Sequence, residues 1–164
     1  MNRAEALDLL KRNIKTSNLL KHTYAVEAVM RGMARRFQQD EELWGLAGLL
    51  HDIDYEETKD DAARHSLVGG EILEREGLPP EVVYAVKSHN HYHGLERKSL
   101  MDKALYASDP RTGLIVAGAL IRPEKKLAPV DVPFLVNRFH EKSFARGANR
   151  EQIGLLSNRR AGIV

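Results

Sequence analysis

The chain has 164 residues, a length typical of one domain, and 43% hydrophobic with 29% charged residues indicates a folded globular protein. The formal net charge is only +2, so charge alone does not indicate a nucleic-acid-binding surface. The absence of cysteine excludes disulfides, thiolate metal sites and a cysteine nucleophile.

The beginning of the chain and its apolar runs argue against secretion and membrane insertion. Charged residues interrupt the first apolar residues, unlike the apolar core of a secretory signal. The longest uncharged apolar run, residues 112–121, has about half of the ~20 residues that a membrane span needs. We therefore expect a cytoplasmic protein with no membrane partner.

Apolar residues recur at three and four positions in the first half of the chain, which predicts helices. Between residues 51 and 57 lies an acidic stretch that we expect to be a loop. The predicted helices on either side of it cover residues 3–14, about 18–37, 40–50, 61–76 and 80–92.

The second half of the chain has the same helical periodicity and no lasting alternation of period two. Pro110 is expected in the first turn of a helix. No repeat or domain linker is present, so we predict one all-α domain, a helical bundle, over residues 1–164. The predicted helices of this half cover residues 100–108, 110–121, 133–142 and 149–158.

Four of the seven histidines fall on predicted inward faces or helix ends. His22 lies on the apolar stripe of the second helix, and His51 ends the third helix, which is apolar nearly all round. His65 and His89 lie on the apolar sides of the fourth and fifth helices. His22 alone is more typical of a hydrogen-bonded core residue than of a ligand, whereas the adjacent pair His51 and Asp52 fits a ligand site and a solvated helix end equally well.

Two aspartates accompany these histidines at helix ends. Asp52 directly follows His51, and Asp109 ends an apolar helix, where on its own it predicts an N-cap for the next one. A core that holds four imidazoles and two carboxylates needs a partner that satisfies them all, and a divalent metal ion binds both groups. A core of hydrogen-bonded histidines without metal remains the alternative.

The order of His22, the pair His51 and Asp52, and then Asp109 resembles the HD superfamily of metal-dependent phosphohydrolases. The run GLLHDIDYEE is similar to the signature of the HDIG-type branch, with Asp54 where that branch has glycine.

Two further segments extend the resemblance. HSLVGGEIL, which contains His65, and AVKSHNHYHG, which contains His89, resemble the segments that carry the extra histidines of dinuclear members. The similarity covers about residues 18–126, and residues 127–164 form a C-terminal helical extension.

The resemblance implies an all-helical HD fold with one or two divalent metal ions between its central helices. Asp52 is implied to bridge to a second ion carried by His65 and His89. Asn90 follows His89 where many dinuclear relatives have a second histidine. The metal is left open among Mn, Fe, Co, Ni, Zn and Mg. The implied ligands of the first ion are His22, His51, Asp52 and Asp109.

The activity implied by the resemblance is hydrolysis of a phosphomonoester or phosphodiester, with a nucleotide favoured, by a metal-activated water molecule. The resemblance implies that Asp52 is the central catalytic residue of this activity. Arg111 is our candidate for binding phosphate, because a guanidinium matches phosphate oxygens. Candidates for the general acid are Asp54, Glu56, Glu57 and His91.

Other functions stay open. The alternative to an enzyme is a regulatory helical domain that binds metal or nucleotide without turnover, and Asn90 keeps it open. A second copy of the chain could cover Trp44 and the helices of residues 100–121. A nucleic-acid partner has weak support from C-terminal arginines, namely Arg146, Arg150, Arg159 and Arg160.

Overall fold

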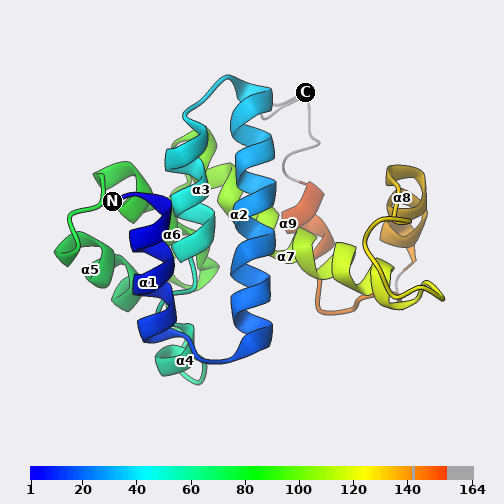
Figure 1. The fold of residues 1–164 in the computed structure, drawn as a ribbon, viewed down its shortest axis with the longest axis horizontal. Coiled ribbons are helices and arrows are strands. Elements are labelled where there is room, and N and C mark those ends of the chain that lie inside the picture. The colour runs from blue at the N-terminus through cyan, green and yellow to red at the C-terminus, as the bar shows by residue number, and fades with distance from the viewer. Residues whose placement is uncertain (142, 155–164) are drawn as a thin grey trace. The chain divides into compact units, whose positions relative to one another are not determined.

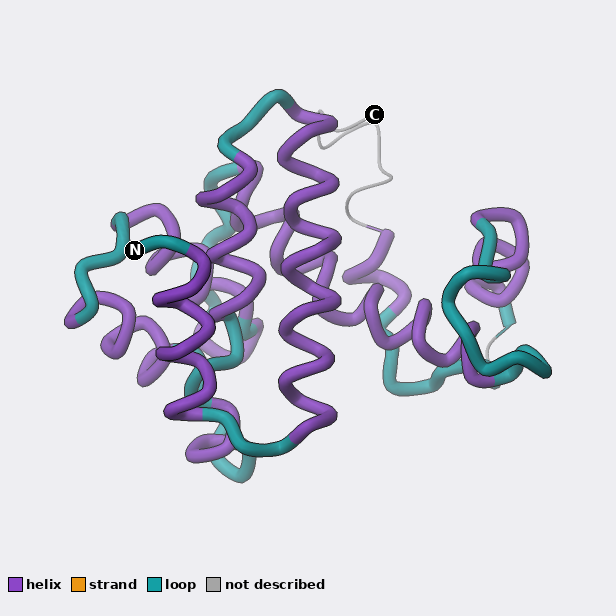
Figure 2. Tube along the Cα trace, in the orientation of Figure 1, coloured by secondary structure: helices purple, strands orange, loops and turns teal. Residues whose placement is uncertain are grey.

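The computed structural model describes residues 1–141 and 143–154, and every regular element in this part is helical (Figure 2), which confirms the predicted all-α class. The chain divides into two compact units, Met1–Tyr106 and Ala107–Val164. The organisation of residues 1–164 as one domain stays a prediction. Within the described part, no helix combines the length and apolar character of a membrane span.

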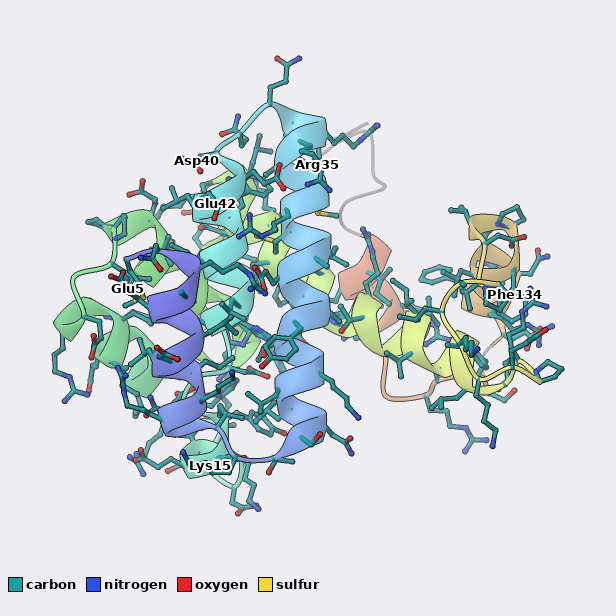
Figure 3. All side chains as sticks on the ribbon, in the orientation of Figure 1. Glu5, Lys15, Arg35, Asp40, Glu42 and Phe134 are labelled. Carbon is teal, nitrogen blue, oxygen red and sulfur yellow. The ribbon has the colours of Figure 1, made fainter. Side chains whose placement is uncertain are left out.

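The first unit contains six helices, a short 3-10 turn and the start of a seventh helix (Figure 1). Side-chain caps fix several helix starts: Asn2 accepts from the backbone of Glu5, and Asp40 (labelled in Figure 3) accepts from the backbone of Leu43. The elements are α1 (Arg3–Asn13), α2 (Ser17–Phe37), α3 (Glu41–Leu50), α4 (Tyr55–Thr58), α5 (Leu67–Arg75), α6 (Pro80–His89), η1 (His91–His93) and α7 (Leu100–Leu120).

Helix α3 is the centre of this unit, as its apolar sequence predicts. All residues from Trp44 to Leu50 are buried, and α3 packs against α1, α2 and α6. The approach to α2 is close at Gly48, where a Cβ atom would lie 2.9 Å from the Cα atom of Glu27 and from the carbonyl oxygen of Val26. Glycine is therefore required for α2 and α3 to pack at this distance.

Three predicted helix boundaries are wrong. Residues 62–66 form a turn instead of the first part of a helix, and Ser66 has a φ of 70°. The fifth helix ends at His89 rather than at residue 92. The two helices predicted on either side of Pro110 are one helix, α7, because a proline removes one backbone hydrogen bond without necessarily ending a helix.

The second unit contains the rest of α7 with α8 (Val132–His140) and α9 (Arg150–Gly154). Its small apolar core consists of Leu114, Ala148 and Ile153, with Phe139 packed against them. The last predicted helix is described only as far as residue 154, so its end, like Arg159 and Arg160, lies outside the described residues.

Candidate metal centre

Both carboxylate oxygens of Asp52 face pairs of histidines. Asp52 Oδ2 lies 3.6 Å from His22 Nε2 and 3.3 Å from His51 Nε2. Asp52 Oδ1 lies 3.5 Å from His65 Nε2 and 3.5 Å from His89 Nε2. These five residues, which we call the Asp52 cluster, form two groups that could each hold a metal ion and that share Asp52.

Helix packing brings the cluster together from distant parts of the chain. His22 lies in α2, and His51 directly follows α3, so the close packing of these two helices places their Nε2 atoms 3.2 Å apart. Helix α6 also packs on α3 and contributes His89 as its last residue. His65 comes from the turn before α5, not from a helix face as predicted.

The second ring nitrogen of two cluster histidines is fixed by the end of its own helix. His51 Nδ1 lies 2.9 Å from the carbonyl oxygen of Gly48, and His89 Nδ1 lies 2.6 Å from that of Val86. A carbonyl oxygen only accepts, so each Nδ1 donates its hydrogen and the neutral ring presents an unprotonated Nε2. Carbonyls in the last turn of a helix have no partner within the helix, which explains why they are available.

His65 is fixed by a carboxylate instead. Its Nδ1 lies 3.2 Å from Asp54 Oδ1, while Asp54 Oδ2 accepts from the backbone N–H groups of Ser66 (2.7 Å) and Gly69 (2.9 Å). The side chain of Asp54 is fully buried. These contacts favour a role in orienting His65 over the role of general acid predicted from the sequence.

The charges of the cluster suit a cation. Burial alone would raise the pKa of Asp52, but positive charge on the imidazoles of His51 and His89, together with their hydrogen bonds, outweighs burial and lowers the pKa of this carboxyl well below its usual range. Where the rings are neutral, with Nδ1 protonated, their Nε2 atoms carry lone pairs and a metal cation would take the place of that positive charge. A cation between these atoms satisfies the lone pairs and the carboxylate together.

The donor atoms and their spacing fit a divalent metal ion. Imidazole nitrogen and carboxylate oxygen are common ligands of transition metals. Two nitrogens that each lie about 2.0–2.1 Å from one ion are themselves about 2.8–3.4 Å apart at angles of about 90–109°. The 3.2 Å between the Nε2 atoms of His22 and His51 falls in this range.

Five of the six predicted metal ligands thus lie in the Asp52 cluster, while Asp109 and Arg111 belong to the second unit. Arg111 donates from Nη2 to the carbonyl oxygen of Ile153 (3.0 Å), and burial lowers the pKa of its guanidinium. The ligand role of Asp109 and the phosphate-binding role of Arg111 remain predictions.

Two other candidate acids have partners elsewhere in the first unit. One carboxylate oxygen of Glu56 accepts from the backbone N–H groups of Lys15 and Thr16, between α1 and α2. Glu57 pairs with Arg64. These contacts engage both carboxylates, and the general-acid role of either glutamate stays a prediction.

Sequence reasoning missed how the turn of His65 is held. Asn90 and His93 both contact the backbone carbonyl oxygen of His65, at 3.0 Å and 2.8 Å. The residues are separated by 25 and 28 positions, so helical periodicity carries no signal for these contacts.

Known proteins that are similar to this chain include ribonuclease Y from several bacteria and a tRNA methyltransferase. Ribonuclease Y of Sulfurovum sp. (strain NBC37-1) is 37% identical over 87 residues, which is 53% of this chain and 16% of that protein. Ribonuclease Y of Desulforudis audaxviator is 30% identical over 140 residues, which is 82% of this chain and 26% of that protein. The tRNA (cytidine(56)-2'-O)-methyltransferase of Thermoplasma volcanium is 34% identical over 83 residues, 51% of this chain and 24% of that protein.

The chain therefore spans about a quarter or less of the length of these relatives. No solved structure matches it. The model of the HD domain family matches residues 19–128, a stretch that includes His22, the pair His51 and Asp52, and Asp109. The helical fold, the convergence of histidines on Asp52 and this match together place the chain in the HD domain family.

Proposed function

We propose that the protein is a metal-dependent phosphohydrolase with the Asp52 cluster in its active site. The observation that carries this proposal is that one buried carboxylate has an oxygen facing each of two imidazole pairs. Such a set suits one or two divalent ions, with Asp52 as the ligand common to both groups. Divalent ions held there would supply Lewis acidity, which would polarise a phosphoryl oxygen and lower the pKa of a water molecule.

The protein's own residues prepare the site in two ways. Helix carbonyls fix the rings of His51 and His89, so their Nε2 atoms face Asp52 before any ligand binds. The side chains of His22 and His65 are 26% and 14% exposed, so both keep some contact with solvent.

The resemblance of the sequence to the HD family supports two further proposed residues, both in α7. They are Asp109 as a metal ligand and Arg111 as a phosphate-binding residue, because a guanidinium matches phosphate oxygens. Asp54 is assigned to orient His65.

A nucleotide is the proposed substrate. Tyr55 has a ring centroid 5.3 Å from that of His65 and is 40% exposed, and Tyr92, in η1, is 62% exposed. Exposed tyrosine rings provide faces on which bases stack. The names of the relatives, ribonuclease Y and a tRNA methyltransferase, also point to nucleic acid or its components.

A regulatory domain that binds metal or nucleotide without turnover is the second candidate. The observation that favours it is Asn90, which follows His89 and has both ends of its amide bonded to backbone groups. An amide used in this way adds no strong ligand to the His65 side of the cluster.

Hydrolysis assays distinguish the two candidates. Purified protein loaded with Mn²⁺ or Co²⁺ is incubated with mono-, di- and cyclic nucleotides and with ribose 5-phosphate as a control without a base. Phosphate release that requires metal and is faster with the nucleotides supports the enzyme. Binding of nucleotide to the metal-loaded protein without release across the panel supports the regulatory domain.

A further inference from the structure

The turn that carries His65 is held from the segment that follows α6. The backbone carbonyl oxygen of His65 accepts from Asn90 Nδ2 at 3.0 Å, and His93 Nε2 lies 2.8 Å from the same oxygen. Asn90 Nδ2 also donates to the carbonyl oxygen of Ala62 at 2.9 Å. Two side chains thus bind both ends of the short turn between residues 62 and 66.

The amide of Asn90 has no free polar atom in this arrangement. Its two N–H hydrogens are used by the carbonyls of Ala62 and His65, and its Oδ1 accepts from the backbone N–H of Tyr92 at 3.0 Å. These partners also fix which end of the amide is nitrogen, because carbonyl oxygens require a donor and the N–H of Tyr92 requires an acceptor. A metal ligand at this position needs its oxygen free, and Oδ1 is occupied.

His65 is therefore held at three points. Its backbone carbonyl is held by Asn90 and His93, its Nδ1 lies 3.2 Å from Asp54 Oδ1, and its Nε2 lies 3.5 Å from Asp52 Oδ1. A turn outside a helix has no helical hydrogen bonds to fix its position, so these side chains set the location of the imidazole.

We propose that Asn90 and His93 are positioning residues that hold His65 against Asp52, and so set the affinity of the Asp52–His65–His89 group for a divalent ion, without being ligands themselves. The inference rests on the metal centre of the proposed function. It also explains how the group tolerates asparagine directly after His89: the side chain supports a ligand instead of supplying one.

Replacing Asn90 by aspartate separates a positioning role from a ligand role. Asn90→Asp keeps the shape but removes both donated hydrogens and places a carboxylate against two carbonyl oxygens. In a calorimetric titration with Mn²⁺, we expect the second ion to bind about 10–100-fold more weakly and the first ion to bind as in the wild type. Equal or tighter binding of the second ion overturns the proposal, because a carboxylate is a better Mn²⁺ ligand than an amide.

The matched control is Asn137→Asp, which makes the same change at an exposed position of α8. It should leave both binding steps unchanged. For the second positioning residue, His93→Ala should weaken the second ion, whereas His93→Gln should restore much of the affinity because its amide can donate to the same carbonyl. If His93→Gln and His93→Ala weaken binding equally, the hydrogen bond to His65 is not the reason and the proposal fails for His93.

Hydrogen exchange of the full chain without metal provides a readout that does not depend on the proposed function. In Asn90→Asp, the amides of residues 62–66 should exchange about tenfold faster than in the wild type, with no such change in Asn137→Asp. Unchanged exchange overturns the proposal. If the wild type binds no Mn²⁺, the proposed function fails, and so does the assigned effect on ion affinity.

Discussion

The Nε2 atoms of His22 and His51 lie 3.2 Å apart, although 29 positions separate the two residues in the chain. Nδ1 of His51 is occupied by the carbonyl of Gly48, so Nε2 of the neutral ring carries a lone pair toward His22. Asp52 Oδ2 lies within 3.6 Å of both nitrogens. These three atoms form one of the two groups that could hold a metal ion.

Asp52 is the residue on which metal binding should depend most. Asp52→Ala removes the carboxylate common to both groups, so we expect metal affinity to fall by more than the ~10–100-fold typical of changes to residues behind the ligands. Metal content after dialysis and any phosphate release should both be lost. His140→Ala, at the end of α8, should change neither, and similar losses in the two variants would show that the site is misplaced.

Asp54 should act through His65 and not as a proton donor. In Asp54→Asn, the charge that orients His65 Nδ1 is lost, so we expect Mn²⁺ affinity to fall about 10–100-fold by calorimetry. Asp60→Asn, at a nearby exposed position, should keep the wild-type affinity. Unchanged metal binding together with a lower kcat would instead favour the general-acid role predicted from the sequence.

Gly48 should be required for the packing that brings His22 and His51 together. A Cβ atom at this position meets the backbone of α2 at 2.9 Å, which no side-chain rotation can relieve. Gly48→Ala should lower the free energy of unfolding by about 1–3 kcal/mol in urea titrations of metal-free protein. The control is Gly32→Ala in α2, where the nearest atom is the end of the Arg35 side chain at 3.8 Å. It should stabilise by up to about 1 kcal/mol, and a loss equal to that of Gly48→Ala would contradict this explanation.

Glu56 should stabilise the fold in a pH-dependent way. Hydrogen bonds from Thr16 and Lys15 lower the pKa of its carboxyl in the folded protein, so folding favours the ionised form. The resulting stability is fully present above the unfolded pKa of about 4.3 and is lost as pH falls through the lower, folded pKa.

The comparison is between the wild type and Glu56→Gln, with chelator present. The variant should unfold at a lower temperature at neutral pH, and the difference should shrink as the pH falls below about 4. Glu71→Gln, an exposed glutamate of α5, should show no such pattern. A difference for Glu56→Gln that is the same at neutral and acidic pH would rule out the ionised carboxylate as its source.

The parts of the fold that depend on local pattern could be predicted from the sequence. Helix α3 is central because residues 43–50 are apolar on every side, and Asp40 begins it as an N-cap. His22, His51 and His89 could be placed because each lies on the apolar face or at the end of a helix. Because buried imidazoles need polar partners, the sequence also predicts that these histidines lie near one another and near a shared partner.

The surroundings of His65 could not be predicted in this way. The turn before α5 forms because Asp54 accepts from the backbone of Ser66, 12 positions away, and because Asn90 reaches Ala62, 28 positions away. Such contacts leave no periodic trace in one sequence, and a helical pattern over residues 61–76 favours the wrong conformation for the turn. The contact of Asp54 with His65, 11 positions away, was missed for the same reason.

Anomalous scattering from a crystal of the protein grown with Mn²⁺ tests the shared metal centre most directly. We predict a peak about 2.0–2.3 Å from His22 Nε2, His51 Nε2 and Asp52 Oδ2, and a second peak between Asp52 Oδ1, His65 and His89. A crystal that contains Mn²⁺ only at other positions, with neither group of the Asp52 cluster bound to an ion, would contradict this prediction.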